Sequence, residues 1–273
     1  MPTFETSDQT PIHYEDWGDG PPIVFLASWA SSSRMWQYQM AALADQGFRT
    51  IAYDRRGHGR SGSPRSGYDY NTLADDLAGL IDHLDLQGVT LVTHSMGEGE
   101  AVRYFTRHGD ERVAKLILTC PLGPLPLRTA DNPNGLDPAV VEAVRASWKQ
   151  DLPAWMDANK DGFFGTGLPG CAVSPGVVEW TRHDMLQASL WALIECNRSG
   201  VATDRRPDMV NIAVPTLIIL GDHDQSAPSE LAGNVCAELI EGSVLEVYEN
   251  APHALYLTHR DRLTADIMRF AKQ

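Results

Sequence analysis

The chain has 273 residues, of which 43% are hydrophobic and 21% charged, a composition typical of globular proteins and not of disordered, fibrous or membrane-embedded chains. Its formal net charge of −14 produces a field that repels phosphate backbones and anionic lipid surfaces, so neither nucleic acid nor a membrane is an expected partner. The N-terminus lacks the basic start and apolar run of a secretory signal, and no apolar stretch is long enough to span a bilayer, so we expect a cytoplasmic protein. The four cysteines form no CxxC pair, which predicts free, buried thiols.

Short apolar runs alternate with amphipathic helical patterns along most of the chain. This alternation predicts βαβ units around a mostly parallel sheet, and therefore an α/β fold class. The predicted strands are residues 23–26, 50–53, 89–93, 113–118, 216–220 and 244–247. The predicted helices, in which apolar residues recur at three- and four-residue spacing, are residues 36–45, 70–84, 97–107, 230–239 and 260–271.

The alternation is interrupted once, by a segment without a clear strand. Helical patterns in this segment cover residues 138–149, 152–159 and 176–199. We expect one domain, with an α/β core formed by residues 1–120 and 208–273 and a helical cap formed by residues 121–207. Most of the aromatic side chains of the cap are expected to hold it together, and the others to line an apolar pocket; they are Trp148, Trp155, Phe163, Phe164, Trp180 and Trp191.

A candidate nucleophile, Ser95, stands between the strand 89–93 and the helix 97–107. A serine on a sharp strand-to-helix turn presents its hydroxyl clear of the sheet, and small residues must flank it because the strand and the helix pass closely. Gly97 meets this requirement, whereas Thr93 stands where the G-x-S-x-G pattern has its first glycine. The Met96 amide is placed to donate to a developing oxyanion. Glu98 and Glu100 are expected to interact with the helix dipole, although the role of Glu98 stays open.

The candidate base and acid follow the last two predicted strands. His253 comes after a short loop behind strand 244–247, at the carboxyl end of the sheet where sites of this kind collect. Strand 216–220 leads to Asp222 and Asp224, of which Asp222 is expected to tie the turn together and Asp224 to orient His253. His94 is expected to point away from Ser95. The three residues predict acyl transfer through an acyl-enzyme, with no metal and no cofactor.

Four ordered motifs carry a resemblance to a known family. They are Tyr-Asp-Arg-Arg-Gly-His-Gly-Arg-Ser at 53–61, Thr-His-Ser-Met-Gly at 93–97, Gly-Asp-His-Asp at 221–224 and Asn-Ala-Pro-His at 250–253. Together they resemble the α/β-hydrolases, and His-Ser-Met-Gly with Ala-Pro-His-Ala-Leu-Tyr resembles the cofactor-free haloperoxidase, perhydrolase and esterase branch. The resemblance implies ester hydrolysis by Ser95, Asp224 and His253, with a side reaction in which hydrogen peroxide replaces water.

The resemblance also implies an oxyanion hole made by the amides of Trp29 and Met96. The family's loop at this point typically begins His-Gly, whereas this chain has Ala27-Ser28, so we expect a reshaped loop or a hydroxyl in the hole. The charges and glycines of residues 54–59 are expected to lock neighbouring loops rather than to act in catalysis.

Other functions stay open at this level. A lactonase uses the same residues on a cyclic ester, a cofactor-independent dioxygenase uses a His-Asp pair on an aromatic substrate, and a non-catalytic receptor keeps only the ligand pocket. Haloalkane dehalogenases and epoxide hydrolases need an aspartate nucleophile, and Ser95 argues against them. The expected partner is a small-molecule substrate with an apolar acyl or ring group; the oligomeric state, a homo-oligomer included, is not fixed by the sequence.

Overall fold

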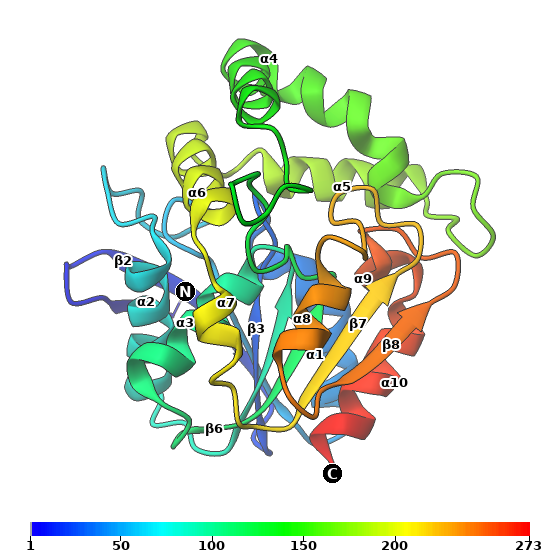
Figure 1. Cartoon of the computed structure of the whole chain (residues 1–273). Coiled ribbons are helices and arrows are strands. Elements are labelled where there is room, and N and C mark those ends of the chain that lie inside the picture. The colour runs from blue at the N-terminus through cyan, green and yellow to red at the C-terminus, as the bar shows by residue number, and fades with distance from the viewer. Residues whose placement is uncertain (1) are drawn as a thin grey trace.

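The computed structural model describes residues 2–273 and is built around one eight-stranded sheet, with strand order β1-β2-β4-β3-β5-β6-β7-β8 (Figure 1). β4, β3, β5, β6, β7 and β8 run parallel, whereas β1 and β2 join the β4 edge in antiparallel pairs. The strands are β1 (Thr3–Glu5), β2 (Pro11–Trp17), β3 (Pro22–Leu26), β4 (Arg49–Tyr53), β5 (Val89–His94), β6 (Val113–Thr119), β7 (Thr216–Gly221) and β8 (Val244–Tyr248).

The parallel part of this sheet confirms the six predicted strands, with bounds that differ by one residue at most. The sequence analysis missed the antiparallel pair β1 and β2. β1 has only three residues, and β2 mixes apolar with charged and polar side chains, so neither gives the continuous apolar run of a buried parallel strand.

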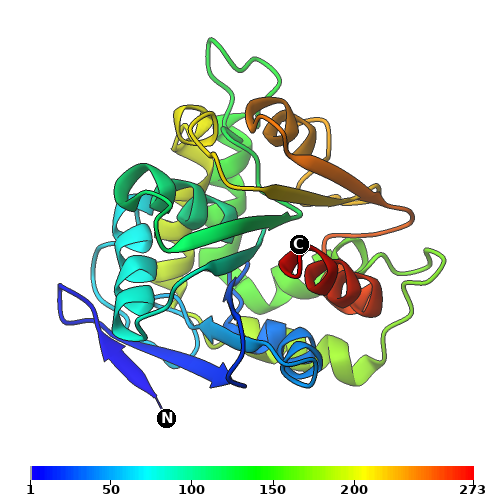
Figure 2. The same ribbon diagram turned by 90° about the horizontal axis from the view of Figure 1, so that it is seen from below.

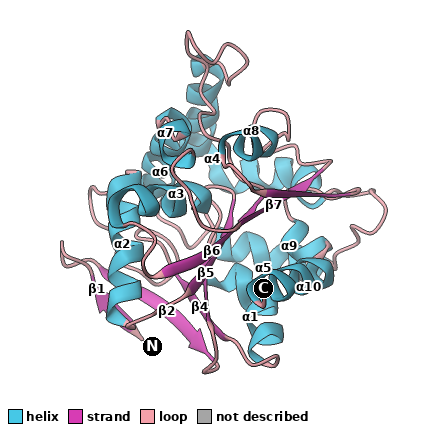
Figure 3. Ribbon diagram, turned by 60° about the horizontal axis from the view of Figure 1, so that its bottom comes forward, coloured by secondary structure: helices cyan, strands magenta, loops and turns pink. Residues whose placement is uncertain are grey.

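Helices cover both faces of the sheet (Figures 2 and 3). One face carries α2 (Tyr70–His83), α3 (Gly97–His108), α7 (Arg206–Met209) and α8 (Gly233–Leu239). The other carries the 3-10 helix η1 (Ser33–Trp36), α1 (Gln37–Ala44), α9 (Leu255–Thr258) and α10 (Arg260–Ala271). No helix in residues 2–273 has both the length and the apolar composition that a bilayer crossing needs.

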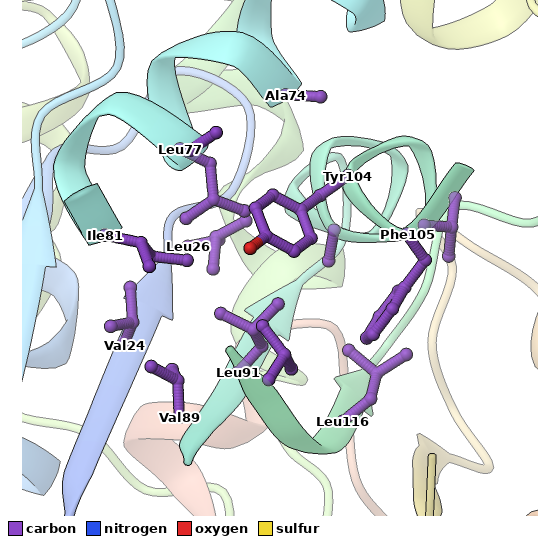
Figure 4. Close-up of a cluster of buried hydrophobic side chains, with 14 of the residues drawn as sticks. Val24, Leu26, Ala74, Leu77, Ile81, Val89, Leu91, Tyr104, Phe105 and Leu116 are labelled. Carbon is purple, nitrogen blue, oxygen red and sulfur yellow. The ribbon is translucent and has the colours of Figure 1, made fainter. Parts of the chain in front are cut away.

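The core follows from the two-residue period of the strands. Val24 and Leu26 of β3 pack with α2 and α3, while Ile23 and Phe25 point to the opposite face and pack with α1. Figure 4 shows the first of these clusters, in which Leu77 and Tyr104 close over the β3 and β5 side chains. Because both faces are covered, the sheet is held rigidly and the loops at its carboxyl edge have a fixed base.

Three helices between β6 and β7 form the segment expected as the cap, and they lie above the carboxyl ends of the strands in Figure 1: α4 (Pro138–Phe164), α5 (Pro175–Met185) and α6 (Leu190–Ala202). α4 contains a kink at Asp151, whose φ of −160° is not helical, two residues before Pro153. Proline lacks an N–H and clashes with the preceding turn, and the Asp151 carboxylate accepts the Ala154 N–H to restart the helix. The predicted segments 138–149 and 152–159 are thus the two halves of one kinked helix, and 176–199 divides into α5 and α6.

Candidate active site

Ser95 lies in the turn between β5 and α3 with a φ of 52°, in the left-handed region that a non-glycine residue rarely adopts. Its backbone N–H donates to Thr119 of the neighbouring strand, at 3.0 Å. A side chain at Gly97 would come within 3.0 Å of Leu26 and of the Ala27 carbonyl oxygen, which explains why a glycine follows the serine. The sharp turn expected at this serine is therefore present, although Thr93 replaces the usual first glycine.

The loop after β3 lies directly beside this turn, because Leu26 is paired with Thr93 in the parallel register of β3 and β5. We call residues 27–29 the oxyanion loop. Within residues 2–273, neither the Trp29 N–H nor the Met96 N–H donates to another group of the chain, and both residues line the same cavity as Ser95. Ser28 also lines the cavity and has no left-handed φ, so serine fits here without glycine's freedom.

Asp224 and His253 form a buried pair. Asp224 Oδ2 lies 2.7 Å from His253 Nδ1, and its other oxygen accepts the N–H groups of Ser226 and Ala227, each at 2.8 Å. Burial alone would raise the pKa of Asp224, but the attraction of His253 and these hydrogen bonds outweigh it and lower the pKa. A carboxylate held ionised at Nδ1 fixes the imidazole tautomer that leaves Nε2 free to accept a proton.

The nearby carboxylate of Asp222 ties the turn after β7 together, as expected. Its Oδ1 accepts the Ala251 N–H at 3.2 Å and lies 2.7 Å from His223 Nδ1, so it connects the β7 and β8 loops without reaching His253. Ser95 and His253 both line the cavity, and Asp224 is paired behind His253.

His94 supports His253 in a way that sequence reasoning missed. Its Nε2 lies 2.8 Å from the His253 carbonyl oxygen, and the two rings meet edge to face with centroids 4.6 Å apart. Burial, together with the neighbouring His253, lowers the pKa of His94 to about 3, so His94 is neutral and its Nε2–H donates to the carbonyl. The only sequence signal was a histidine at the inward-facing end of a fully buried strand.

The cavity has a volume of about 400 Å³ and lies between the sheet edge and the cap helices. Four of the six cap aromatics line it, more than expected: Trp148, Trp155, Phe163 and Phe164. Trp148 packs against Trp29 with tilted rings, 4.4 Å between centroids, and Trp155 meets Trp29 edge to face at 6.0 Å, so α4 lies directly over the oxyanion loop. Trp180 packs against Tyr38 instead, and the indole N–H of half-exposed Trp191 donates to the backbone carbonyl oxygen of Arg65.

Glu98 and Glu100 form buried ion pairs, so the expected interaction with the helix dipole does not describe their main contacts. Glu98 pairs with Arg205, and both side chains are completely buried. Glu100 pairs with Arg55 and accepts the Tyr53 hydroxyl. Both arginines lie far from these glutamates in the sequence, so the sequence of the first helical turn does not predict these ion pairs.

The motif at residues 54–59 locks loops together, as expected. Asp54 accepts the N–H groups of Ser33 and Arg60, each at 2.8 Å, and so joins this turn to the segment that follows the oxyanion loop. Gly59 has a φ of 51°, and a side chain there would collide with the Asp54 carboxylate.

His94, Cys120 and His253 offer metal-ligating atoms that lie within 4.8 Å of one another, and all three residues are buried. Two of the ring nitrogens already have partners, because His253 Nδ1 is bonded to Asp224 and His94 Nε2 to the His253 carbonyl. A metal ion bound through those nitrogens would have to displace these bonds.

Comparison with known proteins shows the family to which the chain belongs. Residues 21–169 match the family model described as alpha/beta hydrolase fold. The chain is 35% identical to a non-heme chloroperoxidase of Kitasatospora aureofaciens, over 99% of both chains. It is 34% identical to a bifunctional esterase/perhydrolase of Acinetobacter calcoaceticus, over 98% of both chains. An esterase from Exiguobacterium antarcticum superimposes with a TM-score of 0.94 at 34% identity, over 99% of both chains.

Proposed function

We propose that this chain, which belongs to the α/β-hydrolase family, hydrolyses a carboxylic ester or lactone through an acyl-enzyme formed on Ser95. The observation that carries the proposal is that Ser95, His253, Trp29 and Met96 line one cavity, and that the N–H groups of Trp29 and Met96 have no acceptor within residues 2–273. The similarity of the chain to a bifunctional esterase/perhydrolase and to an esterase of known structure supports the same reaction.

The reaction proceeds in two halves, and His253 acts first as base and then as acid in each of them. Ser95 Oγ attacks the ester carbonyl carbon while His253 Nε2 takes the serine proton, and the Trp29 and Met96 N–H groups donate to the resulting oxyanion. The C–O bond to the leaving group then breaks, and His253 returns the proton to the departing oxygen. In the second half, His253 deprotonates water, which attacks the acyl-enzyme; the bond from the acyl carbon to Ser95 Oγ then breaks, and His253 returns the proton to Oγ as the acid leaves.

The lining of the cavity favours a substrate that is bound through an apolar acyl or ring group. Aromatic side chains of the cap, with the methionines Met156 and Met185, form apolar walls, and charged side chains such as Lys160 and Arg182 also line the cavity. Walls of this kind stabilise a substrate by removing apolar surface from water, while the few polar groups beside Ser95 fix the position of its ester.

The proposal is tested by Ser95→Ala together with an alkyl phosphonate that labels nucleophilic serines. We expect the phosphonate to modify Ser95, and Ser95→Ala to lose hydrolysis of p-nitrophenyl esters and small lactones by roughly 10⁴-fold or more. An active Ser95→Ala variant that consumes oxygen with an aromatic substrate would instead indicate a dioxygenase. Tight binding of a small ligand with no turnover by the unmodified chain would indicate a receptor.

We also propose that hydrogen peroxide replaces water in the second half-reaction, on the strength of the similar esterase/perhydrolase. Attack of peroxide on the acyl-enzyme gives a peracid and free Ser95, so the step needs no redox change of the protein. Peracid formation from an acetate ester and peroxide, abolished in Ser95→Ala, is the expected result. Peracid formation that survives in this variant would contradict the acyl-enzyme route.

A further inference from the structure

Arg55, at the carboxyl end of β4, lies buried beneath the oxyanion loop. Its guanidinium donates from Nη2 to the Ala27 carbonyl oxygen at 2.6 Å and from Nη1 to the Ser28 carbonyl oxygen at 3.1 Å. The side chain is only 2% exposed. Two consecutive carbonyl groups of the oxyanion loop are therefore held by one rigid, planar cation.

The bond to the Ser28 carbonyl fixes the direction of the Trp29 N–H. The two groups belong to the same planar trans peptide, and in such a peptide the C=O and the N–H point in opposite directions. With the oxygen turned down onto Arg55, the Trp29 N–H is turned away from it. That N–H has no acceptor within residues 2–273, and Trp29 lines the cavity.

Arg55 is itself fixed by the helix that carries the other N–H group. Its Nε donates to Glu100 Oε1 at 2.5 Å, and Glu100 also accepts the Tyr53 hydroxyl. Glu100 lies in α3, four residues after Met96. Arg55 thus connects the oxyanion loop with the start of α3, the two segments that supply the Trp29 and Met96 N–H groups.

We propose that Arg55 is a positioning residue that keeps the oxyanion hole assembled by holding the Ser28–Trp29 peptide in one orientation. The inference rests on the proposed function, because it assigns a purpose to the Trp29 N–H in that reaction. A hydrogen-bond donor aimed beforehand at the developing oxyanion stabilises the transition state more than the bound substrate, so loss of Arg55 should lower kcat and leave KM nearly unchanged.

The experiment uses Arg55→Lys and Arg55→Met, with Arg56→Met as the matched control. Arg56 is a neighbouring, equally buried arginine that pairs with Asp76 and Asp8 and, within residues 2–273, makes no hydrogen bond or ion pair with the oxyanion loop. Arg55→Lys keeps the charge beside Glu100 but cannot hold both carbonyls and the carboxylate in one plane. Glu100→Gln, which weakens the anchor of Arg55, provides a fourth variant if Arg55→Met does not fold.

We expect kcat for p-nitrophenyl acetate, measured per folded protein, to fall about 10- to 100-fold in both Arg55 variants, with KM within about threefold of the unmodified enzyme. Affinity for an alkyl trifluoromethyl ketone, whose adduct with Ser95 places an oxyanion in the hole, should fall in parallel with kcat/KM. Glu100→Gln should show a smaller loss of the same kind. Arg56→Met should lower thermal stability and leave kcat close to that of the unmodified enzyme.

Two results would overturn the inference. The first is an unchanged kcat in Arg55→Lys, or in Glu100→Gln if neither Arg55 variant folds. The second is a loss of kcat in Arg56→Met equal to that in the Arg55 variants, which would show that destabilisation alone is responsible. Ser95→Ala separates this failure from failure of the proposed function. If Ser95→Ala is inactive while the Arg55 variants keep kcat, only the role of Arg55 is wrong; if Ser95→Ala is active, the proposed function is wrong.

Discussion

At the scale of single residues, the geometry around Asp224 predicts the effect of removing one charge. Asp224→Asn keeps the size of the side chain but places an amide opposite His253 Nδ1, 2.7 Å away in the unmodified chain. An amide N–H facing Nδ1 favours the tautomer with the proton on Nε2, which cannot accept the Ser95 proton. We expect kcat for ester hydrolysis to fall roughly 10³- to 10⁴-fold, as measured by steady-state kinetics.

The control for Asp224→Asn is Asp222→Asn. Asp222 lies two residues earlier in the same loop but makes no hydrogen bond or ion pair with His253, so its replacement should disturb the loop and leave kcat within about tenfold of the unmodified value. Equal losses in the two variants, or an Asp224→Asn variant with nearly full activity, would show that Asp224 does not orient the base.

At the scale of secondary-structure elements, Arg205 joins α3 to both ends of the cap. It donates to the Glu98 carboxylate from Nε at 3.0 Å and from Nη2 at 3.4 Å, and its remaining donors bond the carbonyls of Gly123, Gly200 and Thr203. Gly123 follows β6 where the cap begins, and Gly200 and Thr203 lie where it ends. All five N–H donors of the guanidinium are used, so the pair tolerates complete burial.

Breaking this pair is expected to cost stability because it leaves a buried charge without a partner. Arg205→Met should lower the free energy of unfolding by about 3 to 5 kcal/mol, measured by urea denaturation. The double variant Glu98→Leu with Arg205→Met removes both charges, so it should be more stable than Arg205→Met alone. A loss below about 1 kcal/mol in Arg205→Met would mean that water reaches Glu98 and that the pair does not fix the cap.

These elements also show what could be predicted from the sequence. The six parallel strands and the helices between them follow from local apolar patterns, and Ser95, His253 and Asp224 stay candidates that their positions after the carboxyl ends of strands predict. The partners of Glu98 and Glu100 depend on which distant segments the fold brings together, and Arg205 lies 107 residues after Glu98. A pattern within one helix therefore pointed to the dipole, and the buried pairs required the three-dimensional structure.

At the scale of the whole molecule, folding removes several histidines from water. His58 and His94 are completely inaccessible to solvent, and burial lowers the pKa of each to about 3. The positive charge of Arg55 contributes to the shift of His58, and the neighbouring His253 to that of His94. Both rings are therefore neutral in the folded protein, whereas both can take up a proton once the chain unfolds.

This difference predicts that stability falls as the pH is lowered from about 6.5 towards 3, because in that window the unfolded chain binds the two protons and the folded chain does not. Between pH 7 and pH 5, each histidine should lower the free energy of unfolding by roughly 2 kcal/mol. In His58→Asn, the difference between urea denaturation at pH 7 and at pH 5 should shrink by that amount. The matched control, His183→Gln, changes a solvent-exposed histidine and should leave the difference as it is in the unmodified protein. An unaltered difference in His58→Asn would mean that His58 takes up its proton within the folded protein.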